Sequence, residues 1–245
     1  MTLTSIIIPT YNGLSYLADC IASIRAYTTP PYEIVVVDNG STDGTTDFCR
    51  RESLRFVSLP DNRGFPAACN TGLRLASGDR LLLLNNDVIV SHRWLDNMAD
   101  CLDHARDVGI VGPYTNYASG KQRMIAPYET IGQYHEMAIH LNAPNPYQWL
   151  QVDRLVGFCF LFKRELYERI GELDERFSPG HYEDDDYCYR ARLAGYRLMI
   201  AGDTVVHHHG SASFFKQDEG RLAALIDRNH RLFVEKWGVD PLAFV

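Results

Sequence analysis

The chain has 245 residues, of which 46% are hydrophobic and 22% are charged, and its formal net charge is −7. The length allows one large α/β domain or two small ones, and the composition is ordinary for a soluble globular protein. The negative charge argues against a nucleic-acid-binding surface, which needs clustered Lys and Arg, so we expect no nucleic-acid partner.

Predicted strands and helices alternate along the first hundred residues. The predicted strands are Leu3–Ile8, Glu33–Val37, Leu54–Leu59, Leu81–Leu84 and Val108–Val111. The predicted helices between them are Leu14–Tyr27, Thr45–Glu52, Gly64–Ser77 and a helix capped by Ser91 that runs to about His104. Strands separated by helices of this length predict βαβ units, and hence a mostly parallel, Rossmann-like sheet flanked by helices.

The pattern changes after residue 111. From Gly112 to Leu150 the periodicity is weak and Pro, Gly, Asn and Tyr are frequent, which predicts a functional loop region or flap. Beyond it we predict a β-rich run, two short helices, two strands and an amphipathic helix, over Val152–Phe162, Arg164–Ile170, Asp184–Leu193, Tyr196–Ile200, Thr204–His208 and Glu219–Trp237. With no repeat or linker, we expect one domain, residues 1–245, with functional halves of about 1–111 and 112–245.

The cysteine and hydropathy patterns predict the compartment. Six cysteines are scattered without CxxC spacing, mostly among apolar neighbours, which predicts reduced core residues in a cytosolic protein. The chain enters a predicted strand at once, which argues against a signal peptide. No run approaches the roughly 20 apolar residues that span a bilayer. We expect a cytoplasmic protein, with peripheral attachment to the inner face of a membrane and the oligomeric state left open.

Polar loops follow each of the first four predicted strands. They are Pro9–Gly13, Asp38–Ser41, Pro60–Gly64 and Asn85–Asp87. Ligands of open α/β sheets lie beyond the carboxyl ends of the strands, so these loops predict one ligand site. Asp87, at the end of the run LLLLNND, is placed to hold a divalent cation against a phosphate. Asp38 is placed to accept from a pyrimidine imide or a ribose hydroxyl, although a helix-capping turn is the alternative.

Four consecutive acids, Glu183 to Asp186, begin the predicted helix after residue 182. The helix dipole favours one or two anions at this position, and four exceed what capping requires. Their mutual repulsion is expected to raise the pKa of at least one, which suits a general base. Asp186 lies one turn before Arg190 and is expected to pair with it, which leaves Asp184 or Asp185 to face a cleft.

Three histidines end the predicted strand Thr204–His208. Side chains alternate on a strand, so His207 and His209 share one face and His208 takes the other. The chain lacks the HExxH and Cys patterns of common zinc sites. We interpret one of these histidines as a partner of Asp87 at the cation, with a surface or core histidine cluster as the alternative.

Six segments, in chain order, resemble those of family 2 glycosyltransferases, in particular the bacterial rhamnosyltransferase-like branch with the GT-A fold. They are SIIIPTYNG, VVVDNGSTDGT, PDNRGFPAACNTGLRLASGD, LLLLNNDV, YEDDDYCYRARLAGY and HHHGSASF. They extend from about Thr4 to Phe214. The resemblance implies a GT-A fold and an inverting transfer of a sugar from a nucleotide-diphosphate donor to an acceptor hydroxyl.

Carried over by position, the resemblance implies a role for individual residues. Asp38 would read the base, and the nucleotide-binding residues would be Pro9, Thr10, Tyr11, Asn12, Asp38, Asn39, Asn62, Gly64, Asn70, Asn85 and Asn86. Asp87 would bind the divalent cation, Mg²⁺ or Mn²⁺, with His207 or His208. Asp184 would be the catalytic base, with Asp185 as the next candidate. The acceptor region would contain Gly157, Phe158, Cys159 and Glu183.

The triplet Asn85-Asn86-Asp87 departs from the family pattern, because many relatives carry two acids there. One carboxylate predicts a weak cation site, and it makes the dependence on metal a question to test. Mg²⁺ commonly binds through one or two carboxylates together with substrate phosphates, so the site is still expected to form.

The resemblance predicts a UDP- or dTDP-sugar donor, with dTDP-rhamnose as a candidate, and a glycan or lipid-linked acceptor in cell-surface polysaccharide synthesis. Aromatic residues in Gly112–Leu150 are suited to stacking on sugar rings. The alternatives are a sugar-nucleotide pyrophosphorylase and a non-catalytic glycan-binding relative. A pyrophosphorylase is expected to carry a Gly-rich, basic loop after the first strand, where this chain reads PTYNG.

Overall fold

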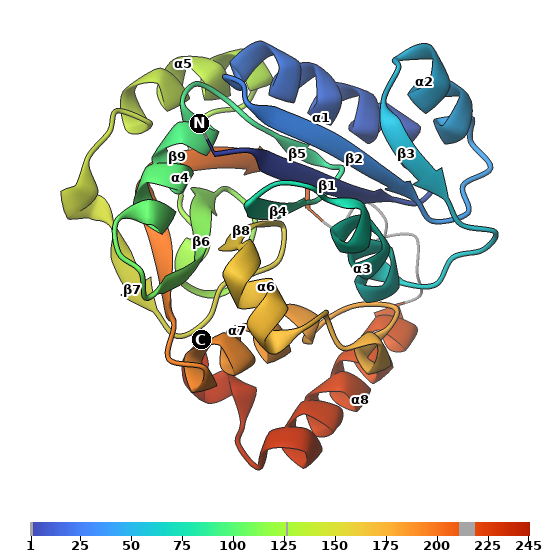
Figure 1. Ribbon diagram of the computed structural model, residues 1–245, viewed down its shortest axis with the longest axis vertical. Helices are drawn as coiled ribbons and strands as arrows, with labels where there is room; N and C mark the ends of the chain where they lie inside the picture. The colour runs from blue at the N-terminus through green and yellow to red at the C-terminus, as the bar shows by residue number, and fades with distance from the viewer. Residues whose placement is uncertain (1, 126, 211–218) are drawn as a thin grey trace.

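The computed structural model describes residues 2–125, 127–210 and 219–245, and within these residues one nine-stranded sheet carries helices on both faces (Figure 1). The strands are β1 Thr4–Thr10, β2 Tyr32–Asp38, β3 Arg55–Ser58, β4 Arg80–Leu84, β5 Val88–Ile89, β6 Val108–Thr115, β7 Leu150–Val152, β8 Cys159–Lys163 and β9 Arg197–His208. The helices are α1 Leu14–Tyr27, α2 Thr45–Arg51, α3 Phe65–Leu75, α4 Trp94–Asp103, α5 Ile131–Leu141, α6 Arg164–Ile170, α7 Glu183–Leu193 and α8 Glu219–Trp237. Their order in the sheet is β3-β2-β1-β4-β8-β6-β9-β5, and β7 pairs with β9.

The first part of the sheet is parallel, as predicted. β3, β2, β1 and β4 lie side by side, and α1, α2 and α3 connect them in turn. All of β1 is buried, as is β4 from Leu81 to Leu84. Such continuous apolar runs suit strands that are covered on both faces, and the predicted α/β class is confirmed.

The second part of the sheet is mixed. β8 lies antiparallel between β4 and β6, and β5 and β7 run antiparallel to β9, whereas β6 and β9 are parallel. An apolar run indicates that a strand is buried but carries no information about its direction. The sequence pattern therefore does not predict that β8 is antiparallel to its neighbours.

Two hydrophobic layers hold the helices on the sheet. One packs α1, α2 and α4 on one face, with Leu17, Phe48 and Trp94 among its members. The other packs α3, α6 and α7 on the opposite face, with Leu73 and Tyr187 among its members. The carboxyl ends of β1, β2 and β4 and the start of α7 are thereby fixed in a rigid frame.

The prediction that Gly112–Leu150 is a loop region is wrong for part of its length. β6 continues to Thr115, and α5 follows with a capping box in which Thr130 and Gln133 satisfy each other's backbone N–H groups. Only Tyr134 and Ala138 of this helix are buried. An apolar face this narrow gives a weak helical period, so composition dominated the prediction.

Three smaller predictions also differ from the structure. The strands predicted over 196–200 and 204–208 are one strand, β9, with a bulge where Pro113 pairs with Ala201 and Tyr114 with Val205. The run Val152–Phe162 is divided between β7 and β8. Ser91 does not cap α4, which begins at Trp94, because its hydroxyl lies 3.0 Å from His135 Nδ1.

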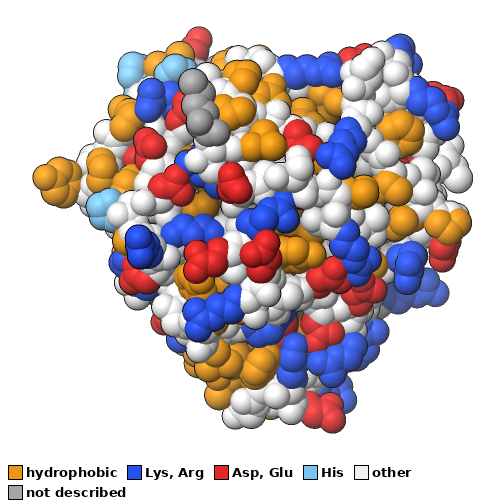
Figure 2. Space-filling model, viewed as in Figure 1, with side chains coloured by type: hydrophobic (Ala, Val, Ile, Leu, Met, Phe, Trp, Pro, Cys, Tyr) orange, Lys and Arg blue, Asp and Glu red, His pale blue; other side chains and the backbone are white. Residues whose placement is uncertain are grey.

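All six cysteines are free and buried, as predicted for core residues. In the described parts of the chain, no helix combines the length and the hydropathy that crossing a bilayer requires. On the face seen in Figure 2, acidic and basic side chains are interspersed rather than gathered by sign.

Asp186 joins α7 to α8 through a buried charged cluster. Its Oδ2 accepts from Arg190 Nε at 2.9 Å, which confirms the predicted pair. Its Oδ1 accepts from Lys236 Nζ at 2.6 Å and from the Trp237 indole at 2.8 Å. The Asp186 side chain has no exposed surface.

Asp186→Ala is expected to lower the free energy of unfolding by about 3–5 kcal/mol, because it removes the carboxylate partner of Arg190 and one of the two carboxylates that contact Lys236. Urea denaturation measures this change. The control is Asp227→Ala, which removes an exposed ion pair with Arg231 and is expected to cost about 0.3–0.5 kcal/mol. Equal losses in the two variants would contradict the structural role given to Asp186.

Candidate active site

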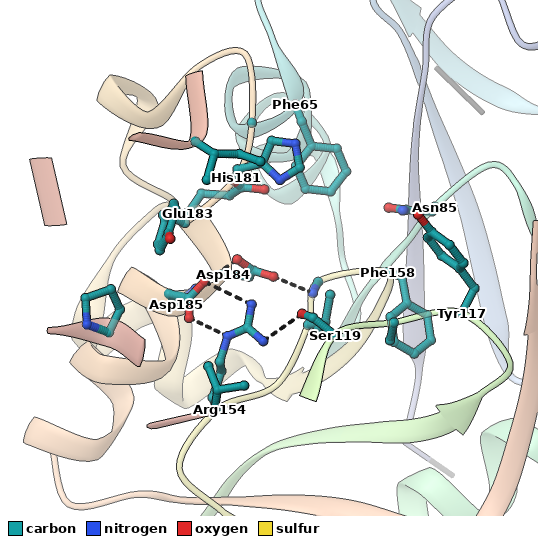
Figure 3. Close-up of a pocket in the computed structure, with 18 of the residues that line it drawn as sticks. Phe65, Asn85, Tyr117, Ser119, Arg154, Phe158, His181, Glu183, Asp184 and Asp185 are labelled. Atoms are coloured by element: carbon teal, nitrogen blue, oxygen red, sulfur yellow. Dashed lines mark hydrogen bonds and ion pairs between the residues drawn. The ribbon is translucent and has the colours of Figure 1, made fainter. Parts of the chain in front are cut away.

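A pocket of about 660 Å³ lies between the end of β4, the end of β9 and the first turn of α7 (Figure 3). Asn85 and His208 line one end of it, and the acids Glu183 to Asp185 line the other. The pocket therefore joins the predicted cation site to the predicted base.

Asp38, the predicted reader of the base, is fully buried. Its Oδ1 accepts from the Ser41 backbone N–H at 3.0 Å, and its Oδ2 accepts from the Ser58 hydroxyl at 2.6 Å. In this structure the carboxylate therefore braces the end of β2 against β3. Each oxygen keeps a further acceptor site, but the side chain has no exposed surface, so a contact with a base would require the rim to move.

Asn39 and Asn62 are committed to the scaffold of the same rim. Asn39 Nδ2 donates to Asn62 Oδ1 at 2.9 Å and to the Gly64 carbonyl at 3.1 Å, and its Oδ1 accepts from the Arg63 N–H. Gly64 has a φ of +88°, and a Cβ there would lie 2.9 Å from Pro179 Cα. The rim thus touches the segment that leads into α7, backbone to backbone.

Asn70, predicted to lie beside a nucleoside, is hydrogen-bonded inside the fold in this structure. It is 1% exposed, and its amide donates to the Leu173 carbonyl and to Glu175 while its Oδ1 accepts from the Leu173 N–H. Its position on α3 faces the connection after α6, so the side chain anchors that connection. In this structure both polar atoms of its amide group are used inside the fold, and its contact with a nucleoside stays a prediction.

The remaining residues of the rim come from the ends of β1 and β4. Pro9 and Thr10 are buried within β1, and Asn86 Nδ2 donates to Thr10 Oγ1 at 2.8 Å. Asn12 Oδ1 accepts from the Thr42 N–H at 2.8 Å, and Tyr11 is 38% exposed. Of these residues, the Tyr11 ring has the most surface available to a ligand.

Asn85, Asp87 and His208 converge at one end of the pocket. His208 Nε2 lies 3.2 Å from Asp87 Oδ1 and 3.5 Å from the Asn85 amide nitrogen. His208 Nδ1 lies 2.8 Å from the Tyr117 carbonyl. A carbonyl can only accept, so Nδ1 carries the proton, and in the neutral ring Nε2 presents a lone pair toward Asp87.

This end of the pocket fits a hard divalent cation. Asn85 Oδ1 is buried and has no hydrogen-bond partner among the described residues, which leaves an oxygen ligand available. Within those residues no group of three or more His, Cys, Asp or Glu side chains is arranged to hold a metal ion. Asp87 and His208 would therefore need further ligands from substrate oxygens or water, as Mg²⁺ sites commonly do.

His207 lies on the opposite face of β9 from His208. Its Nδ1 is 2.7 Å from the Tyr128 hydroxyl, and its ring packs near Tyr134 and His209. Burial, followed by the charges of the neighbouring histidines, lowers the pKa of His207 to about 4. Of the two histidines predicted as ligands, only His208 faces Asp87.

Asp184 is held at the other end of the pocket by two backbone groups. Its Oδ2 accepts from the Gly157 N–H at 2.8 Å, and its Oδ1 accepts from the Asp185 N–H at 2.9 Å (Figure 3). Both hydrogen bonds fix the direction of the carboxylate. His181 and Tyr182, just before α7, have φ of +72° and +73°, a conformation that non-glycine residues adopt rarely.

The other two acids of this turn differ in charge and partners. Burial, followed by the charge of Asp184, raises the pKa of Glu183 well above its ordinary value, and its Oε2 is buried without a hydrogen-bond partner in the described structure. Burial and Asp184 also raise the pKa of Asp185 to about 7, although Arg154 opposes the shift. Both oxygens of Asp185 contact the Arg154 guanidinium.

The predicted acceptor residues before β8 divide between the pocket and the core. Gly157 and Phe158 line the pocket, and Phe158 stacks on His208 with ring centroids 5.1 Å apart. Cys159 is buried, with its thiol 3.9 Å from the Met98 sulfur, so it belongs to the core. Among the aromatic residues of 112–150, Tyr117 lines the pocket, whereas Tyr147 is fully exposed.

Sequence reasoning missed Arg154 and Ser119. Arg154 reaches Asp185 with Nε and Nη2 and donates from Nη1 to Ser119 Oγ at 2.9 Å. Neither residue belongs to a motif with fixed spacing.

Comparison with known proteins gives one match to a family model. The model described as glycosyl transferase family 2 matches residues 5–171. The chain is similar to the N-acetylglucosaminyl-diphospho-decaprenol L-rhamnosyltransferase of Mycobacterium tuberculosis, at 26% identity over 247 residues, 88% of this chain and 78% of that protein. It is also similar to the uncharacterized protein y4gI of Sinorhizobium fredii, at 27% identity over 265 residues.

Among solved structures, the fold is similar to that of the mannosyltransferase PcManGT from Pyrobaculum calidifontis in complex with GDP-Man and Mn²⁺. The TM-score is 0.64 at 25% identity, over 84% of this chain and 56% of that one. The match to y4gI covers 98% of this chain but 28% of that protein. The chain therefore spans less than a third of y4gI and little more than half of PcManGT.

Proposed function

Because this chain belongs to glycosyl transferase family 2, we propose that it transfers a sugar from a nucleotide-diphosphate donor to an acceptor hydroxyl, with inversion at the anomeric carbon. The observation that carries the proposal is that one pocket is lined both by Asp184 and by His208, whose Nε2 lies 3.2 Å from Asp87. A diphosphate at one end and a base at the other bracket the space that a transferred sugar requires. Residues of about 1–111 would bind the donor, and 112–245 would bind the acceptor.

In the proposed reaction Asp184 is the general base. Its carboxylate takes the proton of the acceptor hydroxyl while that oxygen forms a bond to the anomeric carbon. The bond from this carbon to the diphosphate breaks on the opposite side, and its electron pair leaves with the diphosphate. The N–H groups of Gly157 and Asp185 support this role because they hold the carboxylate oxygens in place. A positioned base contributes about 10²–10⁴-fold to a rate.

Asp87 and His208, with Asn85 beside them, would hold a divalent cation, Mg²⁺ or Mn²⁺. When bound, the cation neutralises the negative charge that grows on the departing diphosphate. His208 is oriented for this role by the Tyr117 carbonyl and by stacking on Phe158. The Mn²⁺ and GDP-Man in the PcManGT structure support the proposal of a cation and a nucleotide sugar.

For the substrates we propose a UDP- or dTDP-sugar donor, with dTDP-rhamnose as a candidate, and a glycan or lipid-linked sugar as the acceptor. The similarity to the rhamnosyltransferase of M. tuberculosis supports this choice. A GDP-sugar is the competing donor, supported by the GDP-Man in PcManGT. Such a reaction would serve cell-surface polysaccharide synthesis in the cytoplasm, at the inner face of the membrane.

The proposal predicts that one nucleoside diphosphate, among UDP, dTDP and GDP, raises the melting temperature of the protein, and more so with Mn²⁺. A ligand at 100 times its dissociation constant is expected to add about 2.7 kcal/mol of stability. Release of the same diphosphate from the matching nucleotide sugar then measures turnover. A pyrophosphorylase would instead form the nucleotide sugar from a nucleoside triphosphate, and a glycan-binding relative would release no diphosphate.

A further inference from the structure

Asp184 and Asp185 place two carboxylates side by side in the first turn of α7, and both are buried. They are held differently. Asp184 is bound by two backbone N–H groups, whereas Asp185 is bound at both oxygens by the Arg154 guanidinium. Side-chain exposure is 6% for Asp185 and 15% for Arg154, so water screens this ion pair little.

Two adjacent carboxylates in a buried site do not both ionise readily unless a cation compensates one of them. Arg154 is the cation in contact with this pair. Although burial opposes the shift, the charges of Asp185 and Asp184 raise the pKa of Arg154, so it stays protonated. It comes from the connection between β7 and β8, which also supplies the Gly157 N–H to Asp184. One short segment therefore sets both the charge of Asp185 and the direction of Asp184.

Burial shifts the pKa of four titratable groups around the pair toward their uncharged forms. Burial lowers the pKa of His181, just before α7, and raises those of Tyr182, Glu183 and Cys188. Asp240, near Tyr182, adds a further negative charge, and Arg123 lines the same pocket. Among the described residues that contact the pair, compensation of its charge therefore falls to Arg154.

We propose that Arg154 is a positioning residue for the reaction, because it neutralises Asp185 and so keeps the adjacent Asp184 ionised as the base. This inference rests on the proposed function, since it takes Asp184 as the group that receives the acceptor proton. Arg154 acts through Asp185 and does not itself give up or take a proton in the reaction. Its removal would protonate the pair and silence the base without removing any group that reacts.

The test is a titration of the Asp184 carboxyl carbon by ¹³C NMR, without substrate. The resonance of Asp184 is assigned by its loss in Asp184→Asn. In Arg154→Gln, the titration midpoint of Asp184 is expected to rise by about 1–3 pH units, the range in which an adjacent opposite charge shifts a carboxyl. In the double variant Arg154→Gln/Asp185→Asn, which removes both charges, the midpoint is expected to return close to that of the wild type.

Ser119→Ala is the matched control, because it removes the other partner of Arg154 and leaves the charges in place. Its midpoint is expected to equal that of the wild type. If Arg154→Gln does not fold, the comparison of Asp185→Asn with the double variant replaces it, and the double variant is expected to have the higher midpoint. The proposal is overturned if removal of Arg154 leaves the midpoint unchanged, or if the midpoint of the double variant lies well above that of the wild type.

This titration separates the inference from the proposed function. If Asp184→Asn retains turnover, Asp184 is not the base, whatever the titration shows. If Asp184→Asn loses turnover but Arg154→Gln leaves the midpoint unchanged, the base stands and the role of Arg154 fails. A loss of acceptor affinity in both Arg154 variants, with no shift of the midpoint, would instead identify Arg154 as a direct substrate contact and overturn its positioning role.

Discussion

Asp184→Asn is expected to lower turnover by about 10²–10⁴-fold and to leave the affinity for the nucleoside diphosphate nearly unchanged. An amide cannot take a proton from the acceptor hydroxyl. It also offers one acceptor oxygen where the carboxylate offers two, so either the Gly157 or the Asp185 N–H loses its partner. The measurements are the rate of diphosphate release at saturating donor and isothermal titration with the diphosphate.

Asp153→Asn is the matched control for this variant. Asp153 lies on the same connection as Gly157, but its side chain is 57% exposed and it pairs with Arg192. Its turnover is expected to stay within a factor of two or so, because exposed ion pairs contribute roughly 1 kcal/mol or less. Turnover near that of the wild type in Asp184→Asn would refute the base assignment, and Asp185 would then be tested in the same way.

The second large effect is expected at the opposite end of the pocket. Asp87→Ala and His208→Ala are each expected to weaken the Mn²⁺-dependent affinity for the nucleoside diphosphate by about 10–100-fold or more, since even outer-sphere partners of metal sites have effects of this size. The reason is that one carboxylate and one imidazole are the charged or basic protein ligands available there. Calorimetric titration with the diphosphate, with Mn²⁺ present and with Mn²⁺ removed by EDTA, measures this difference in affinity.

His207→Ala provides the contrast to His208→Ala. It removes an imidazole from the same strand, but one that faces Tyr128 instead of Asp87. The response to Mn²⁺ is therefore expected to match that of the wild type, apart from any change in stability. If the wild type binds the diphosphate equally well with and without Mn²⁺, the cation role of Asp87 and His208 is wrong.

Much of the N-terminal fold follows from local rules. The apolar runs of β1, β2 and β4, each followed by a polar loop, predict buried parallel strands whose ends share one edge. The same logic brings Asp87 to that edge. Local sequence patterns also predict the helices α1 and α3 to within a few residues of their observed bounds.

The roles of Asp38 and Asn70 show where such rules stop. Both stand where a ligand contact is plausible, yet their polar atoms are used by Ser41, Ser58 and Leu173, which lie 3 to 103 positions away in the chain. Hydrogen-bond partners this distant are set by the tertiary fold. A sequence pattern locates a polar residue at a sheet edge, but it does not tell whether the fold has already bound it.

Arg154 is a second case. The four acids of α7 predict raised carboxyl pKa values from mutual repulsion; the pKa values of Glu183 and Asp185 are raised, but burial is the larger cause and the charge of Asp184 the second. The proposed division into a base and a paired acid depends on a cation that lies 31 positions before Asp185. No periodicity links these positions, so the assignment of roles required coordinates.

Residues Asn116 to Ser119 form hydrogen bonds with groups at both ends of the pocket. Asn116 exchanges hydrogen bonds with the backbone of His208, Tyr117 holds its imidazole through a carbonyl, and Ser119 accepts from Arg154. A displacement of these four residues would move a cation ligand and loosen the partner of Asp185 together. Under the proposed function, donor affinity and turnover would therefore be coupled, and a substitution that displaces the backbone of this stretch is expected to change both at once.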